Sequence, residues 1–166
     1  MGLAMTSRAR GRFGILAIVA ACAAVAGMAT PVGAASAQRV NIVSNVTFNP
    51  NGPNYGDFTA TGPAVDSGAI CASGTFVDTG AKLTGFRSVT GHVQLQVTKD
   101  FTCDDCSGTF AVKLQINADF NTGIESFAWV AAGTSGDIDG LKAAGTGSTV
   151  PTSTGNINTY VGTVTG

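Results

Sequence analysis

The chain has 166 residues, of which 23 are glycine, about twice the average usage, and its nine basic and ten acidic residues give a formal charge of −1. This charge balance excludes the basic surface by which proteins bind nucleic acids, so no partner of that class is expected. Short runs rich in valine, threonine and phenylalanine, separated by glycine-rich turns, favour an all-β sandwich or barrel.

Residues 1–37 have the features of a secretory signal peptide. Three arginines precede an apolar stretch, Phe13–Ala29, and Ala35-Ser36-Ala37 forms a small-residue cleavage site. Cleavage there predicts a secreted domain of residues 38–166 with no membrane segment after processing. Two alternatives are an uncleaved helix that spans the membrane and lipid attachment at Cys22, which follows Val-Ala-Ala in the manner of a bacterial lipoprotein site.

The secreted part contains 129 residues, enough for one domain with its own core. Three of the nine basic residues and none of the acidic residues lie in the signal segment. The secreted domain therefore carries six basic and ten acidic residues, a formal charge of −4. Its oligomeric state is left open.

The secreted domain reads as a series of short strands in meander order. In chain order the expected strands are Val40–Phe48, Phe58–Thr61, Ile70–Asp78, Leu83–Val89, His92–Phe101, Phe110–Phe120, Ile124–Ala132, Leu141–Thr149 and Ile157–Val164. Turns are expected at Gly62-Pro63 and Thr79-Gly80, and a bulge or bend at Gly74. Eight or so antiparallel strands can close into a barrel, which removes both exposed edges.

The hairpin within residues 92–120 is the clearest of these elements. Apolar and polar residues alternate on both sides of it, as in a half-buried strand, and Lys99 breaks the rule by falling on the apolar face. The connection from Cys103 to Gly108 is expected to be a loop of four or five residues that ends at Gly108. A two-residue turn at Asp104-Asp105 is the alternative.

Three cysteines remain after cleavage, in an oxidising setting that permits one disulfide and one free thiol. The longer loop does not place Cys103 directly opposite Cys106, which favours a bridge from Cys71 to Cys103, while a Cys103–Cys106 bridge stays open as the alternative. The favoured bridge closes a loop of about thirty residues and contributes roughly 3–4 kcal/mol in the chain-entropy model. A redox pair needs a helix N-terminus and zinc needs more ligands, so no metal or cofactor is expected.

Two charged residues are candidates for an interior site. Lys99 lies on the apolar face of its strand, and Glu125 has the same parity as Phe127 and Trp129. If that face lines a barrel, these four side chains can meet a ligand. The alternative is that both charged groups reach water at strand ends.

Other polar groups are expected to be solvated. His92, the single histidine of the chain, begins a strand on the expected outer face; a catalytic triad would need Ser and Asp brought to it by folding, and a solvated surface histidine is the favoured interpretation. The acidic pairs Asp104-Asp105 and Asp137/Asp139 lie in loops, and loop polarity accounts for them. No catalytic residue is therefore assigned.

Several short motifs, in order, resemble the allene oxide cyclase and dirigent-type barrel superfamily, and more closely small exported actinobacterial proteins with this barrel. The resemblance runs from about Phe58 to the end and rests on Ala72-Ser73-Gly74-Thr75, Phe101-Thr102-Cys103-Asp104-Asp105, Ser107-Gly108-Thr109-Phe110, Trp129, Gly133-Thr134-Ser135-Gly136, Leu141, Gly145-Thr146-Gly147 and Tyr160-x-Gly162. The usual pattern has glycine where this chain has Cys106, which implies Cys106 as the unpaired thiol. None of the superfamily's catalytic residues can be matched to this chain.

The expected function is that of a non-enzymatic barrel that binds a small apolar ligand. An eight-stranded barrel is just wide enough to hold one small molecule or to be filled by its own side chains. One alternative is a cyclase- or dirigent-like enzyme that acts on a reactive small molecule inside the barrel. Another is a cell-envelope protein that uses its outer face for interaction.

Overall fold

The computed structural model describes residues 36–87, 91–119 and 121–165. The expected signal peptide lies outside the described residues except for Ser36 and Ala37, which precede the first strand. Within the described ranges, no helix has the length and apolar character needed to cross a membrane.

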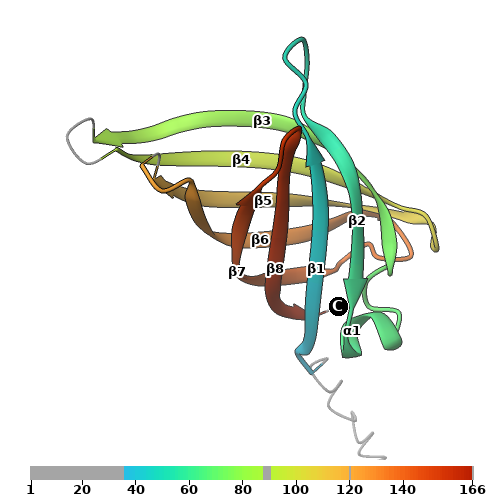
Figure 1. Ribbon diagram of the computed structural model, residues 1–166. Coiled ribbons are helices and arrows are strands. Elements are labelled where there is room, and N and C mark those ends of the chain that lie inside the picture. The colour runs from blue at the N-terminus through green and yellow to red at the C-terminus, as the bar shows by residue number, and fades with distance from the viewer. Residues whose placement is uncertain (1–35, 88–90, 120, 166) are drawn as a thin grey trace, which may run out of the picture. The chain divides into compact units, whose positions relative to one another are not determined.

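Eight antiparallel strands form a closed barrel in meander order, as the sequence predicted (Figure 1). Each strand pairs with the next along the chain, and β8 also pairs with β1. Their bounds are β1 Gln38–Thr47, β2 Tyr55–Thr61, β3 Ser73–Arg87, β4 His92–Cys103, β5 Gly108–Asp119, β6 Ile124–Gly136, β7 Lys142–Pro151 and β8 Gly155–Thr165. Closure satisfies the backbone groups that an open sheet would leave exposed at its edges.

The alternation in the sequence sets which side chains fill the barrel. On β5 the side chains of Phe110, Val112 and Leu114 are buried, whereas Lys113 between them is exposed. The same two-residue period runs along β1, where Val40 and Ile42 are buried. Successive side chains point to opposite faces of a strand, so the apolar set faces the interior.

One long strand, β3, replaces two expected strands, and the predicted turn at Thr79-Gly80 is wrong. Asp78 pairs with Lys99 and Gly80 with Thr98, so Thr79 is the extra residue of a β-bulge. The ladder with β4 continues on both sides, which keeps the chain extended where glycine alone suggested a turn.

The bulge that the sequence predicted as one possibility at Gly74 is not formed. Gly74 pairs in register with Phe58 of β2 and Cys103 of β4. A Cβ atom at this position would overlap the backbone oxygen of Thr102. Glycine is needed here because the neighbouring backbone approaches closely, not because the strand bends.

The two ends of the barrel differ. At one end, called the capped end, the segments 62–72, 104–107 and 137–141 connect the strands. The first holds α1, Pro63–Asp66, a single helical turn at a position where the sequence predicted only a turn. Buried apolar side chains from these segments include Ala64, Ile70 and Ile138.

At the other end, called the rim end, β3 and β4 extend beyond the shorter strands β1 and β2 (Figure 1). Residues 73–77 of β3 pair with β2, whereas residues 80–87 pair along β4. On the inner face of this extension Leu83 and Phe86 are 57% and 61% exposed. The β3–β4 part of the sheet therefore extends beyond the closed part of the barrel and has an apolar inner face.

An aromatic cluster fills the middle of the barrel. It comprises Phe58, Phe76, Phe101, Phe110, Phe127, Trp129 and Tyr160, with ring centroids 4.8 to 6.5 Å apart in contacting pairs. Buried aromatic pairs contribute about 0.5–1.5 kcal/mol each beyond the area that they bury. This cluster separates the capped end from the rim end.

Candidate functional site

Lys99 is the charged residue that the sequence placed on the apolar face, and the structure buries it inside the barrel. Its side chain is 3% exposed, and its Nζ atom lies 2.5 Å from Oδ1 of Asp78 and 4.6 Å from the centre of the Phe76 ring. The alternative that Lys99 reaches water at a strand end is wrong. A buried ammonium group needs such a partner, because desolvation without one is costly.

Asp78 is positioned by the loop between β1 and β2. The side-chain amide of Asn54 donates to Oδ2 of Asp78 at 3.1 Å, and the backbone N–H of Asp78 donates to the carbonyl of Asn54 at 2.8 Å. Asn49 steadies this loop, since its backbone N–H donates to the Asn54 side chain at 3.1 Å. Both carboxylate oxygens of Asp78 are therefore occupied.

Ser44 and Tyr160 point polar groups into the same interior. Both side chains are almost completely buried, and neither hydroxyl has a hydrogen-bond partner of good geometry among the described residues. Burial raises the pKa of Tyr160 to about 12, the nearby polar groups of Ser44 and Asn158 moderate the rise, and the Asp78 carboxylate adds to it. The phenol therefore stays protonated, and able to donate, at neutral pH.

A row of polar residues crosses the wall next to these hydroxyls. In the strand registers Glu125 of β6 is opposite Thr149, Thr149 is opposite Asn158, and Asn158 is opposite Ser44. The Thr149 hydroxyl donates to Oδ1 of Asn158 at 2.9 Å. Glu125 is half-buried at the end of this row, while Lys99 pairs with Asp78. The interior thus holds two sets of polar residues, the Lys99–Asp78 pair and the row that ends at Glu125.

An apolar row runs beside the polar one, from the rim to the centre. Its members are opposite one another in successive strands, in the order Leu83, Leu95, Ile116, Phe127, Gly147 and Tyr160. The rings of Phe127 and Trp129 contact the Tyr160 ring, with centroids at 4.9 and 5.8 Å. The indole N–H of Trp129 donates to the backbone carbonyl of Thr146. The Trp129 ring therefore lines the interior, and its N–H is not free to bind a ligand.

We call the interior residues Ser44, Asp78, Lys99, Thr149, Asn158 and Tyr160 the polar cluster; Asp78 is half-buried, with its side chain 15% exposed, and the other five residues are buried. Sequence reasoning identified Lys99 and named the nearby Glu125, Phe127 and Trp129, but it missed the other members of the cluster. A signal for them exists: Ser44 follows Val40 and Ile42 on the inward face of β1, where a polar residue is out of place. Asn158 breaks the inward face of β8 in the same way.

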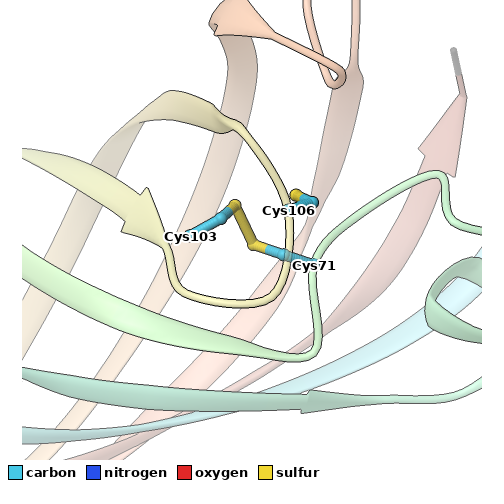
Figure 2. Close-up of side chains that lie close together, drawn as sticks. All are labelled: Cys71, Cys103 and Cys106. Atoms are coloured by element: carbon cyan, nitrogen blue, oxygen red, sulfur yellow. A yellow bond between two sulfur atoms is a disulfide. The ribbon is translucent and has the colours of Figure 1, made fainter.

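The cysteines lie at the capped end, away from this cluster. Cys71 and Cys103 form a disulfide with Cα atoms 5.9 Å apart, the pairing favoured from the sequence, and Cys106 is a free cysteine (Figure 2). The connection between β4 and β5 has four residues, 104–107, as predicted. His92 is exposed at the start of β4.

The outer wall has a hollow of about 430 Å³ across β4, β5 and β6. Outward side chains form much of its lining, among them Gln96, Lys113 and Val130. The amide of Gln96 already donates to Gln115 at 3.1 Å. The barrel interior is the stronger candidate site, because its buried hydroxyls lack partners and a desolvated hydroxyl without one is costly.

Comparisons of the chain with protein-family models, with curated proteins and with solved structures find no match.

Proposed function

We propose that the chain is a secreted, non-enzymatic β-barrel protein that binds one small, largely apolar molecule at the rim end of the barrel. The observation that carries this proposal is the pair of buried hydroxyls, Ser44 and Tyr160, neither of which makes a well-formed hydrogen bond within the described structure. An unpaired buried hydroxyl costs about 1–3 kcal/mol, so a ligand oxygen that pairs with both would recover that free energy.

The apolar row supplies the surface for the rest of the ligand. Leu83 and Phe86 are exposed at the rim, whereas Leu95 and Ile116 behind them are half-buried. Covering one such side chain contributes about 1.5–3 kcal/mol. Because the hydroxyls are sealed from solvent, the ligand reaches them when the half-buried side chains move aside, as in binding that selects an open minor state.

Export is the second part of the proposal, and two observations support it. The first 37 residues combine a basic start, an apolar stretch and a small-residue cleavage site. The Cys71–Cys103 disulfide is compatible with an extracellular, oxidising compartment.

A second candidate function is catalysis inside the barrel by a cyclase- or dirigent-like enzyme. The specific observation in its favour is the proximity of the buried Lys99–Asp78 pair to the Tyr160 phenol, on which the Asp78 carboxylate acts electrostatically. A protonated phenol beside a charged pair can stabilise charge that develops on a reacting oxygen. A ligand recovered chemically unchanged favours binding, and a recovered product favours catalysis.

Native mass spectrometry of the protein purified from its culture medium tests the proposal. We expect a co-purified small molecule that is lost in the variant Leu83→Ser/Phe86→Ser and weakened in Tyr160→Phe. The matched control is Val130→Ser/Val161→Ser on the outer wall, where both valines are more than half exposed, at 53% and 57%. A bound mass that survives the rim variant and falls in the outer-wall control would contradict the interior site.

A probe provides the same comparison when no natural ligand co-purifies. Anilinonaphthalene sulfonate has an apolar body and a polar oxygen group, and its fluorescence rises in apolar surroundings. We expect binding that falls at least tenfold in the rim variant and stays within twofold in the outer-wall control. Equal binding by all variants would place the probe outside the barrel and count against the proposal.

A further inference from the structure

A third sulfur atom lies beside the Cys71–Cys103 disulfide at the capped end. The sulfur atoms of Cys71, Cys103 and Cys106 all lie within 4.8 Å of one another. Figure 2 shows Cys106 on the short loop that passes the bridge. Its side chain is half-buried and packs against the hydrophobic core. The free thiol is therefore held next to the disulfide instead of being displayed to solvent.

Hydrogen bonds from two other segments fix the loop that carries Cys106. The carboxylate of Asp105 accepts from the backbone N–H of Ala72 at 2.8 Å. The backbone N–H of Ser107 donates to the carboxylate of Asp137 at 3.1 Å. Hydrogen bonds on both sides of Cys106 thus anchor the loop and hold the three sulfur atoms close together.

We propose that Cys106 is the attacking thiol of an intramolecular thiol–disulfide exchange that moves the bridge from Cys71–Cys103 to Cys103–Cys106. The Cys106 thiolate attacks Sγ of Cys103, and a sulfur–sulfur bond forms between them. The Cys71–Cys103 bond breaks, and its electron pair leaves on Sγ of Cys71, which takes up a proton from water. One disulfide and one thiol exist before and after the step, so no oxidant or reductant is consumed.

The exchange changes how the cover of the capped end is attached. Cys71 follows α1 in the segment 62–72, and the bridge ties this segment covalently to β4. After exchange the segment keeps backbone hydrogen bonds, such as the one from the N–H of Ala60 to the carbonyl of Ala72 at 2.7 Å. The new bridge closes a much shorter loop, which constrains the unfolded chain less. The exchange therefore removes the covalent attachment of the segment 62–72 to β4, and this segment then opens more readily.

The electrostatics around Cys106 set the pH range of the exchange. Burial raises the pKa of the Cys106 thiol, and the carboxylates of Asp105 in its own loop and Asp137 in the loop after β6 raise it further. Few molecules carry the thiolate at neutral pH, so the original bridge persists there. The rate increases with pH because the attacking species is the thiolate.

Disulfide mapping of the folded, oxidised protein tests the proposal. Samples held at neutral pH and at about pH 9 are quenched with acid, digested with pepsin under acidic conditions and mapped by mass spectrometry. We expect the Cys103–Cys106 bridge, with Cys71 free, to form at a rate that rises about tenfold for each pH unit below the thiol pKa and does not depend on protein concentration.

Cys106→Ser is the first control and should retain Cys71–Cys103 under every condition. The second control, Cys106→Ser/Ser126→Cys, moves the thiol to an exposed outer position on β6, and exchange there can only occur between molecules. A map that keeps Cys71–Cys103 in the wild-type chain, a Cys71–Cys106 bridge, or a rate that rises with protein concentration would each overturn the proposal.

Discussion

The two ends of this barrel use the same eight strands for different purposes. The capped end is closed by apolar side chains from three loops and by a covalent bridge between Cys71 and Cys103. From the aromatic cluster to the rim end, the barrel interior holds a charged pair and two unpartnered hydroxyls, and the rim itself exposes Leu83 and Phe86. The apolar contacts and the bridge at the capped end stabilise the fold, whereas the unpartnered hydroxyls and the exposed apolar side chains in the other part of the barrel reduce its stability.

This difference indicates where function lies. Polar groups buried without partners, and large apolar side chains left in water, are arrangements that folding alone does not favour. Proteins retain such local conflicts mainly at functional sites. Because the aromatic cluster lies between the ends, we expect the rim to change without unfolding of the capped end, so that the two ends can be perturbed separately.

The largest effect is expected from breaking the charged pair at the rim end. Lys99→Met leaves the Asp78 carboxylate in the interior without its cation and should lower the free energy of unfolding by about 3–5 kcal/mol. Lys99→Met/Asp78→Leu removes both charges and should recover most of that loss. Urea unfolding of the two variants measures the difference, and equal loss in both would mean that packing, not charge, sets the cost.

The next effect concerns the capped end. Cys71→Ser/Cys103→Ser removes the bridge across 32 residues and should lower the free energy of unfolding by roughly 3–4 kcal/mol relative to Cys106→Ser. Hydrogen exchange should rise first in the segment 62–72 and remain low for the backbone amides of the aromatic cluster. Uniform acceleration across the barrel would show that the two ends are not independent.

A smaller change in stability, with a large change in binding, is expected at the hydroxyl of Tyr160. Tyr160→Phe keeps the ring and removes the unpartnered group, so the free energy of unfolding should not fall and should rise by at most about 1–3 kcal/mol. Affinity for a ligand or probe at the rim end should fall, as measured by titration. A loss of several kcal/mol in stability would instead reveal that the hydroxyl is bonded in solution.

Much of the fold could be predicted because it depends on a two-residue period. The alternation along β4 and β5 gave the hairpin, its inward face and the burial side of Lys99. The bulge at Thr79 could not be predicted, since Thr-Gly is compatible with both a turn and an extended ladder, and pairing with β4 decides between them. The short helix that begins at Pro63 could not be predicted either, because Gly62-Pro63 is compatible with both a turn and a helix start.

The site was only partly predictable because its members come from distant strands. Lys99 was visible as a charge on an apolar face, but its partner Asp78 lies at the end of another expected strand. Ser44 and Tyr160 meet inside the barrel across β1 and β8, the first and last strands. Closure brings them together, and the stagger of the strands, which no local pattern encodes, sets which residues meet.

The smallest effect is expected at Asp105, which joins two loops of the capped end through its exposed carboxylate. The hydrogen bond from the backbone N–H of Ala72 lowers the pKa of Asp105 below 3.8, against a weaker opposing effect of burial. Because the folded-state pKa is below that of the unfolded chain, the carboxylate stabilises the fold above about pH 4, and this contribution is lost as the pH falls through the lowered value.

Asp105→Asn removes this titration and keeps an oxygen that can accept from Ala72. Urea midpoints of the wild-type chain should therefore fall more steeply than those of Asp105→Asn between about pH 4 and pH 2, and the two curves should run parallel at higher pH. The difference should be small because solvent screens an exposed carboxylate. Asp137→Asn is the matched comparison on the other side of the same loop, and curves of identical slope for Asp105→Asn and wild type would show that the charged Asp105–Ala72 contact does not stabilise the fold above about pH 4.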